Sequence, residues 1–196
     1  GIIDSSRMTW AAYTAGFGKT EKPKNLEDLL LVRRSYSGDQ GIPDSSRYSQ
    51  RPMPEVAAQL TKPDTVILDT ETGISRAAYR LDKRHEFTPA IHIPFHELTN
   101  SDHAWVEAEW QVLIPAAGAK GSIVSTFEHH DKNYGYTAKE LEKTDIIPGT
   151  WNTVRTYYLT PEVRNTNDMF ACYFWLRDTV PLYVEGPKIT VFQRKE

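Results

Sequence analysis

The C-terminal stretch Asp168–Arg194 constrains the fold more than any other part of the sequence. It reads as two long β-strands joined by a short turn. In the first strand, odd and even positions differ in character, and side chains on a strand alternate between its two faces. The strand therefore predicts one buried row and one outer row of polar-tipped aromatic side chains. The buried row is Phe170, Cys172, Phe174 and Leu176, and the outer row is Ala171, Tyr173, Trp175 and Arg177.

The composition is that of an ordinary globular chain. Of the 196 residues, 39% are apolar and 25% charged, so one domain with room for a small additional element is expected. With 23 basic and 26 acidic residues, the net charge of −3 gives no reason to expect nucleic acid or an anionic membrane as partner. The longest aliphatic run, Leu29–Val32, is far shorter than the ~20 residues that span a bilayer. The chain begins at Gly1 without a secretion signal, which favours a processed protein or a soluble fragment of a larger host protein.

The first part of the chain, residues 1–64, is rich in proline and glycine. We expect it to be a loop-rich extension with two short helices, one capped by Asn25 and one over Pro54–Leu60, where proline suits the first helical turn. The rest of the segment, including Ser35–Arg51, reads as irregular loop.

From residue 65 onward, apolar and polar residues alternate with a period of two. This pattern predicts seven or eight strands separated by turn residues, which is typical of an antiparallel sandwich or barrel. Phe87–Leu98 is expected to be extended, and its prolines favour an edge position or a break in that strand. The polar segment Tyr134–Glu142 reads as an insertion with a helical turn. The other expected strands are Thr65–Asp69, Ile74–Leu81, Trp105–Ile114, Ser122–His130, Thr150–Thr160 and the two terminal ones.

Four short motifs carry a resemblance to a known family. They are Thr150-Trp151-Asn152, the strand end Tyr158-Leu159-Thr160-Pro161, Tyr173-Phe174-Trp175, and Pro181-Leu182-Tyr183-Val184-Glu185. Together they resemble the galactose-binding-like jelly rolls, many of which are non-catalytic carbohydrate-binding modules. The resemblance covers about residues 65–194 and implies an all-β antiparallel jelly-roll sandwich over residues 65–196, with carbohydrate as the partner.

The resemblance also implies a possible structural calcium ion. Glu185 stands where these families often have an aspartate that can bind such an ion. Calcium takes six to eight oxygen ligands, and other carboxylates of this chain that could contribute are Asp64, Asp69, Glu71 and Glu86.

The polar rows of the regular strands give the candidate binding residues. If these strands share one sheet, their outer side chains form one surface of aromatics, carboxylates and arginines. Sugar rings pack their C–H groups on flat aromatic faces while charged side chains bind the hydroxyls, and Trp175 is the strongest candidate. The competing interpretation is a solvated face of cross-strand charge pairs. The candidates are Glu107, Glu109, Gln111, Glu128, His130, Arg155, Tyr157, Tyr173, Trp175 and Arg177.

Two other kinds of function remain open. The chain could be a structural or protein-interaction domain whose sheet face is covered, or a glycoside hydrolase that uses Glu107, Glu109 or Glu128, given the carboxyl spacing along a strand. The leading hypothesis is a non-catalytic glycan-binding or accessory module. It would work outside the cytoplasm, either within a larger surface protein or as the soluble part of a larger glycan-processing protein of the cell envelope.

Histidine metal sites and catalytic nucleophiles are not expected from the sequence. His92 and His96 would be too far apart in an extended segment to share a zinc ion, and adjacent His129 and His130 would point to opposite faces if their strand continues. The single cysteine, Cys172, lies in the buried row and has no internal disulfide partner. No G-x-S-x-G, phosphate-loop or dinucleotide motif occurs.

Overall fold

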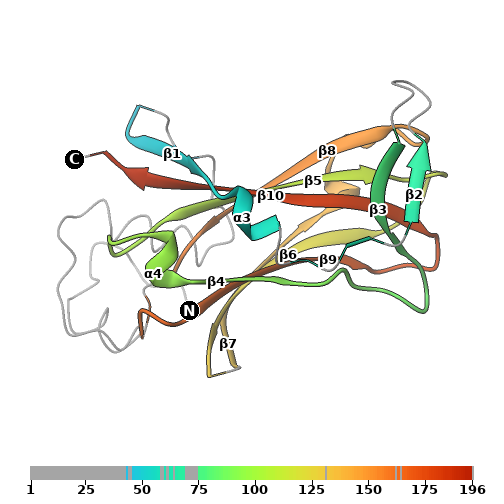
Figure 1. The fold of residues 1–196 in the computed structure, drawn as a ribbon. Helices are drawn as coiled ribbons and strands as arrows, with labels where there is room; N and C mark the ends of the chain where they lie inside the picture. The colour runs from blue at the N-terminus through green and yellow to red at the C-terminus, as the bar shows by residue number, and fades with distance from the viewer. Residues whose placement is uncertain are drawn as a thin grey trace, which may run out of the picture.

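The chain forms a sandwich of two antiparallel β-sheets, and Figure 1 shows them as two layers. This computed structural model shows the all-β jelly-roll sandwich that the sequence predicts. It describes Pro43 and residues 46–57, 60, 62–63, 65–68, 75–130, 132–161, 163 and 165–195. No helix in this described part is long and apolar enough to cross a bilayer.

The larger sheet has the strand order β2-β3-β10-β5-β8, and β1 also pairs with β10. The C-terminal strand β10 is its centre, because it pairs with β5 along one side and with β3 and then β1 along the other. A register shift between Glu185 and Lys188 interrupts its pairing with β5. The strands are β1 (Tyr48–Pro52), β2 (Thr65–Leu68), β3 (Ser75–Leu81), β5 (Trp105–Leu113), β8 (Trp151–Leu159) and β10 (Leu182–Arg194).

The smaller sheet has the order β4-β9-β6-β7, with β4 at one edge as its prolines predict. Residues 86–88 extend that edge, since the Leu176 amide donates to the Glu86 carbonyl and the Thr88 amide donates to the Phe174 carbonyl. Its strands are β4 (Ile91–Pro94), β6 (Gly121–His129), β7 (Lys132–Glu140) and β9 (Met169–Leu176), and the short helices of the chain are α3 (Pro54–Ala57), α4 (Phe95–Leu98) and η2 (Leu141–Lys143).

The core lies between the two sheets and is formed by the apolar rows that alternation predicts. Trp110 of β5 meets Phe174 of β9 edge to face, with ring centroids 6.0 Å apart, and Tyr158 of β8 meets Phe170 at 5.6 Å. Cys172 is completely buried in the same row, and burial raises the pKa of its thiol to about 12. The thiol is therefore protonated and inert at neutral pH, as its position in the sequence predicts.

Three sequence predictions need correction. Ser35–Arg51 is not entirely loop, because β1 begins at Tyr48 and pairs with β10. Phe87–Leu98 is not extended throughout, because Phe95–Leu98 forms a helical turn. Tyr134–Glu142 is not an insertion with a helical turn, because most of it belongs to β7, and the 3-10 turn starts only at Leu141.

Two helix predictions have different outcomes. The helix that begins at Pro54 is present but ends at Ala57, which is earlier than expected. The helix capped by Asn25 falls outside the described residues.

Gly135 allows β7 to lie close to the core. A Cβ atom built there would overlap the hydroxyl of buried Tyr158 and lie 3.2 Å from the Phe127 Cβ. We expect Gly135→Ala to lower the free energy of unfolding by about 1–3 kcal/mol, because a buried tyrosine has little room to move. Urea denaturation measures this loss, with Ala138→Gly on the outer face of the same strand as the comparison. An unchanged midpoint for Gly135→Ala would contradict the packing described.

Candidate functional site

The predicted binding residues lie on two opposite outer faces and not on one. β6 and β9 belong to the smaller sheet, whereas β5 and β8 belong to the larger one. The prediction that their polar rows form a single surface is therefore wrong, because strands with similar alternation were assigned to one sheet when they occupy two. Glu128, Tyr173, Trp175 and Arg177 lie with the smaller sheet, and Glu107, Glu109, Gln111, Arg155 and Tyr157 lie on the larger one.

We call the outer surface of the smaller sheet the aromatic face, defined by Phe87, Tyr136, Tyr173 and Trp175. The Phe87 ring stacks on Trp175, with centroids 5.8 Å apart and planes at 14°, and it meets Tyr173 edge to face at 5.9 Å. Phe87 is 53% exposed and Tyr136 is 59% exposed, whereas Tyr173 and Trp175 are half-buried. Trp175 therefore points outward, as predicted, but Phe87 lies against part of it.

Small side chains separate the rings. Ser122, Val124 and Thr126 of β6 lie in register with Trp175, Tyr173 and Ala171 of β9, so they share the outer face. All three β6 side chains are buried even though they point outward. Rings from β9 on one side and Tyr136 of β7 on the other therefore flank β6, whose small side chains are covered between them.

Polar groups lie among these rings. The Thr126 hydroxyl donates to Glu128 Oε1 at 3.1 Å. Burial, followed by the neighbouring Tyr136 and Glu128, raises the pKa of the Tyr173 hydroxyl. Tyr173 is therefore protonated at neutral pH, and the face offers a hydroxyl and a carboxylate close together.

Arg177 ends the face in an ion-pair cluster. Its guanidinium donates to both carboxylate oxygens of Glu142 at 2.8 and 3.0 Å and lies 3.8 Å from Glu140. In the described structure, three buried polar atoms near this end have no hydrogen-bond partner: Ser122 Oγ, Trp175 Nε1 and Arg177 Nε. Arg177 is thus held by acidic neighbours and is not a freely presented cation.

The larger sheet presents a charged face centred on Glu109. Arg155 binds Glu109 Oε2 through Nε at 2.8 Å and through its terminal nitrogen at 2.6 Å, and Lys188 lies 3.4 Å from Oε1. Burial alone would raise the pKa of Glu109, but the hydrogen bonds and charges of Arg155 and Lys188 outweigh it and lower the pKa. A glycosidase acid needs a raised pKa, so Glu109 is unsuited to that role.

The proposed carboxylate set for glycoside hydrolysis is also not brought together. Glu107 and Glu109 lie on β5, whereas Glu128 lies on β6 of the other sheet. The Tyr157 hydroxyl instead donates a hydrogen bond to the Glu107 carboxylate, and burial followed by this hydrogen bond raises the pKa of Tyr157 to about 12. Beside them, a second apolar cluster on the larger sheet contains Trp105, Leu159 and Phe192, with Tyr48 and Tyr157 packed against it.

The ion pairs of Glu109 make stability depend on pH. The pKa of Glu109 is lower in the folded chain, so its contribution is present above its ordinary value near 4.5 and is lost as the pH falls through the folded value. We expect Glu109→Gln to lower the free energy of unfolding by about 1 kcal/mol at neutral pH and by less at about pH 3. Urea denaturation at both pH values tests this, with exposed Glu97→Gln as control. A loss that is equal at both pH values would contradict it.

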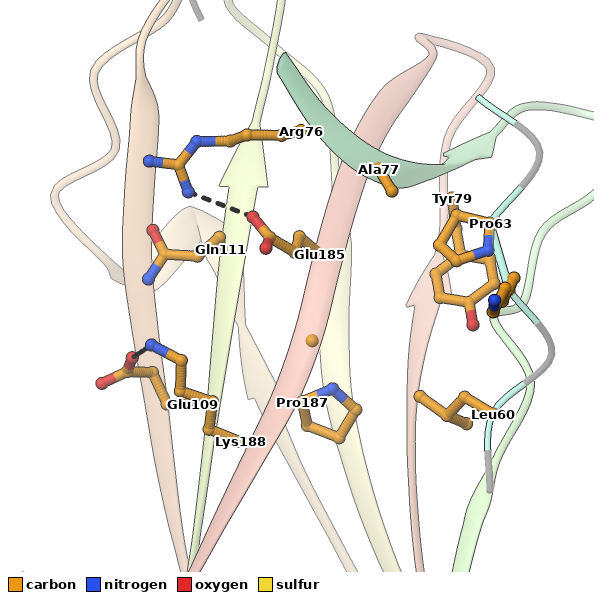
Figure 2. A pocket seen from close by; sticks show the side chains of 12 residues that line it. Leu60, Pro63, Arg76, Ala77, Tyr79, Glu109, Gln111, Glu185, Pro187 and Lys188 are labelled. Atoms are coloured by element: carbon orange, nitrogen blue, oxygen red, sulfur yellow. Dashed lines mark hydrogen bonds and ion pairs between the residues drawn. The ribbon is translucent and has the colours of Figure 1, made fainter. Parts of the chain in front are cut away.

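A pocket of about 490 Å³ opens beside β10 in the larger sheet. On this side, β10 pairs with β3 through Leu182–Val184, its Ile189 carbonyl accepts from the Met53 amide, and it pairs with β1 from Thr190 onward. Among the described strands, this leaves residues 185–188 without a strand partner on this side. Gly186 lies in this gap with a positive φ of 123°, and a Cβ there would lie 3.1 Å from the Glu109 carbonyl. The pocket is lined by Leu60, Lys62, Pro63, Arg76, Ala77, Tyr79, Glu109, Gln111, Glu185, Gly186, Pro187 and Lys188, most of them labelled in Figure 2.

No group of three or more metal-ligating side chains occurs among the described residues. The prediction that His129 and His130 point to opposite faces holds only if their strand continues, and it does not. The strand ends at His129, and His130 has a positive φ of 48°, so their ring centroids lie 4.1 Å apart. Of the carboxylates considered for calcium, Glu185 pairs with Arg76 at 3.0 Å. Asp64, Asp69 and Glu71 lie outside the described residues, so the calcium ion stays a prediction.

The sequence did not predict that Tyr136 and Phe87, two of the four rings of the aromatic face, lie on the surface beside Trp175. Tyr136 was expected in a polar insertion, and alternation from Ile91 would turn Phe87 inward. Phe87 and Ile91 are four positions apart, whereas their partners on β9, Trp175 and Cys172, are three positions apart. The pairing register of the edge segment against β9 therefore shifts by one residue, and Phe87 faces outward. The prolines mark this segment as irregular, but no local signal gives the size of the slip.

No protein-family model matches the chain, and no curated protein matches it either. Among solved structures it is similar to the CBM22-2 xylan-binding domain of Paenibacillus barcinonensis Xyn10C, with 13% identity over 72% of this chain and 90% of that one, and a TM-score of 0.43. It is also similar to the CBM22-1-GH10 modules of Clostridium thermocellum endo-1,4-β-D-xylanase 10B, with 10% identity over 76% of this chain and a TM-score of 0.44. It spans 29% of that chain.

A third similar structure is the C-terminal CBM6 of LamC from Zobellia galactanivorans, with 15% identity over 74% of this chain and all of that one, and a TM-score of 0.34. The solved structures that match are mainly carbohydrate-binding modules, the class that the sequence motifs resemble. All of the identities quoted are 15% or less and all of the TM-scores are below 0.5. What those proteins bind therefore says nothing about the ligand of this chain.

Proposed function

We propose that the chain is a non-catalytic glycan-binding module and that it binds through the aromatic face. The observation that carries the proposal is the grouping of Phe87, Tyr136, Tyr173 and Trp175 on one outer surface. In the described part of the chain, two of the four exposed large hydrophobic side chains, Phe87 and Tyr136, belong to this surface. Contiguous exposed apolar groups rimmed by polar ones are typical of binding sites.

The chemistry of this face suits a sugar chain. Rings on both sides of β6 can pack against the C–H groups of pyranose units, because flat apolar faces fit together closely. Beside the rings, the Tyr173 hydroxyl and the Glu128 carboxylate can exchange hydrogen bonds with sugar hydroxyls. Arg177 would contribute only at the end of the face, since its guanidinium is held by Glu140 and Glu142.

The other predicted residues do not share this site. Glu107, Glu109, Arg155 and Tyr157 lie on the opposite side of the sandwich, so we leave them out of the proposed glycan contact. Their ion pairs and hydrogen bonds, together with the lowered pKa of Glu109, fit a solvated face better than a hydrolytic site.

We place the module outside the cytoplasm, either in the periplasm or at the cell surface, where structural polysaccharides are found. An accessory role in a larger glycan-processing protein of the cell envelope belongs to the same proposal. Cell fractionation that follows the full-length gene product tests the location, and a cytoplasmic pool alone would contradict it.

Affinity electrophoresis in gels that contain one soluble polysaccharide each tests glycan binding. We expect retardation by at least one neutral polysaccharide, and we expect Tyr136→Ala to weaken it about three- to tenfold, since one exposed ring contributes about 0.5–1.5 kcal/mol. Tyr183→Ala, which removes a tyrosine from the opposite sheet, is the matched control. The absence of retardation in every gel, or equal losses for the two variants, would overturn the proposal.

A further inference from the structure

The pocket beside β10 has two walls of different chemistry. Figure 2 shows Arg76, Gln111 and Lys188 on one side of Pro187, and Leu60, Pro63 and Tyr79 on the other. Arg76 reaches from β3 to donate to Glu185 at 3.0 Å and lies over the ring of Trp151, 5.3 Å from its centroid. An apolar wall opposite fixed polar groups is the usual arrangement of a small-molecule site, and the volume falls in the range of such sites.

The charges around this pocket do not cancel. Arg155 holds Glu109 and Arg76 holds Glu185, so each carboxylate already has an arginine. Of the lining lysines, Lys62 is exposed, and Lys188 is 78% exposed and lies 3.4 Å from Glu109. Counting the three lining cations, Arg76, Lys62 and Lys188, against the two lining carboxylates leaves a local excess of one positive charge, and both lysines are flexible side chains that can turn toward a ligand.

We propose that this pocket binds a sugar unit that carries one carboxylate, a hexuronate. The ring lies against the apolar wall, the carboxylate meets Lys188 and Lys62, and the hydroxyls meet Gln111 and Arg76. A carboxylate is the anion that fits these groups together with an apolar sugar face. The site is separate from the aromatic face, because the two surfaces belong to different sheets. It therefore does not depend on the proposed function of that face.

Titration of the isotope-labelled full chain with D-galacturonate, followed by amide NMR, tests the proposal. We expect saturable shifts at the amides of Gln111, Gly186 and Lys188, with D-galactose binding at least tenfold more weakly. Equal affinity for galactose, equal affinity for acetate, shifts confined to Tyr173 and Trp175, or no shifts would each overturn it.

Two variants separate this site from the rest of the molecule. Lys188→Gln is expected to weaken galacturonate binding about tenfold, since it removes one charge-assisted contact from an exposed position that should not disturb folding. Lys132→Gln, which removes an exposed lysine from β7, is the matched control and should leave affinity unchanged. Trp175→Ala should also leave the affinity for galacturonate unchanged. A loss of polysaccharide binding at the aromatic face can therefore be distinguished from a loss of uronate binding in the pocket. Equal effects of Lys188→Gln and Lys132→Gln would overturn the proposal.

Discussion

Replacement of Trp175 by alanine should reduce polysaccharide binding by about thirty- to several hundredfold. Trp175 supports Phe87 through a parallel ring contact and borders Tyr173 on the same strand, so its removal disrupts three of the four rings at once. Central aromatic residues of this kind contribute about 2–4 kcal/mol to a binding free energy. Isothermal titration calorimetry with the polysaccharide that retards the wild-type chain measures this loss directly.

The control for Trp175→Ala must lose a comparable amount of packing. Trp151 on β8 is also half-buried, and Trp151→Ala removes a ring from the larger sheet without touching the aromatic face. Both variants should lower the unfolding midpoint, but only Trp175→Ala should lose glycan affinity. Similar affinities for the two variants would show that the polysaccharide binds elsewhere.

The strands and their buried rows could be predicted from the sequence because both depend on local alternation. Val106, Ala108, Trp110 and Val112 of β5 are buried as their spacing predicts, and the same holds for the apolar row of β9. In each case the side chain period of two fixes which residues share a face. The prediction of these buried rows depends only on residues that are close in sequence, and the structure confirms it.

The assignment of strands to sheets could not be predicted in the same way. β9 and β10 are adjacent in sequence and both alternate, yet β9 pairs with β4 and β6 whereas β10 pairs with β1, β3 and β5. A sandwich buries the same apolar rows whichever sheet each strand joins, so alternation does not indicate to which of the two sheets a strand belongs. This is why one predicted surface became two, with Trp175 and Arg155 on different sheets.

Edge strands limited the prediction of the site itself. β7 is half-polar and contains Gly135 within a strand that packs only on β6, so its sequence resembles a solvated insertion. Strands that carry polar residues and glycine are common at sheet edges, where no second neighbour demands a regular pattern. Tyr136 and Phe87 both lie in such edge segments, and their place beside Trp175 depends on pairing that local sequence does not specify.

The buried carboxylate of Asp168 connects the ends of three strands. It accepts hydrogen bonds from His129 Nδ1 of β6 at 2.6 Å, from the Tyr134 hydroxyl of β7 at 2.6 Å and from the Asn165 amide at 3.2 Å. Its backbone carbonyl also accepts from the Phe95 amide at the start of α4. Asp168 is 3% exposed, so these partners replace the water that a free carboxylate would bind.

Removal of this carboxylate should give the largest stability loss of any substitution discussed. Asp168→Ala leaves the Tyr134 hydroxyl and the His129 ring without their acceptor. Removing the charged partner from a buried group of this kind lowers the free energy of unfolding by about 3–5 kcal/mol. Asp168→Asn keeps one acceptor oxygen and should lose about 1–3 kcal/mol. Urea denaturation at neutral pH measures both, with Asp145→Ala in the exposed segment before β8 as control. A loss below about 1 kcal/mol for Asp168→Ala would mean that the carboxylate does not hold β6 and β7 to β9.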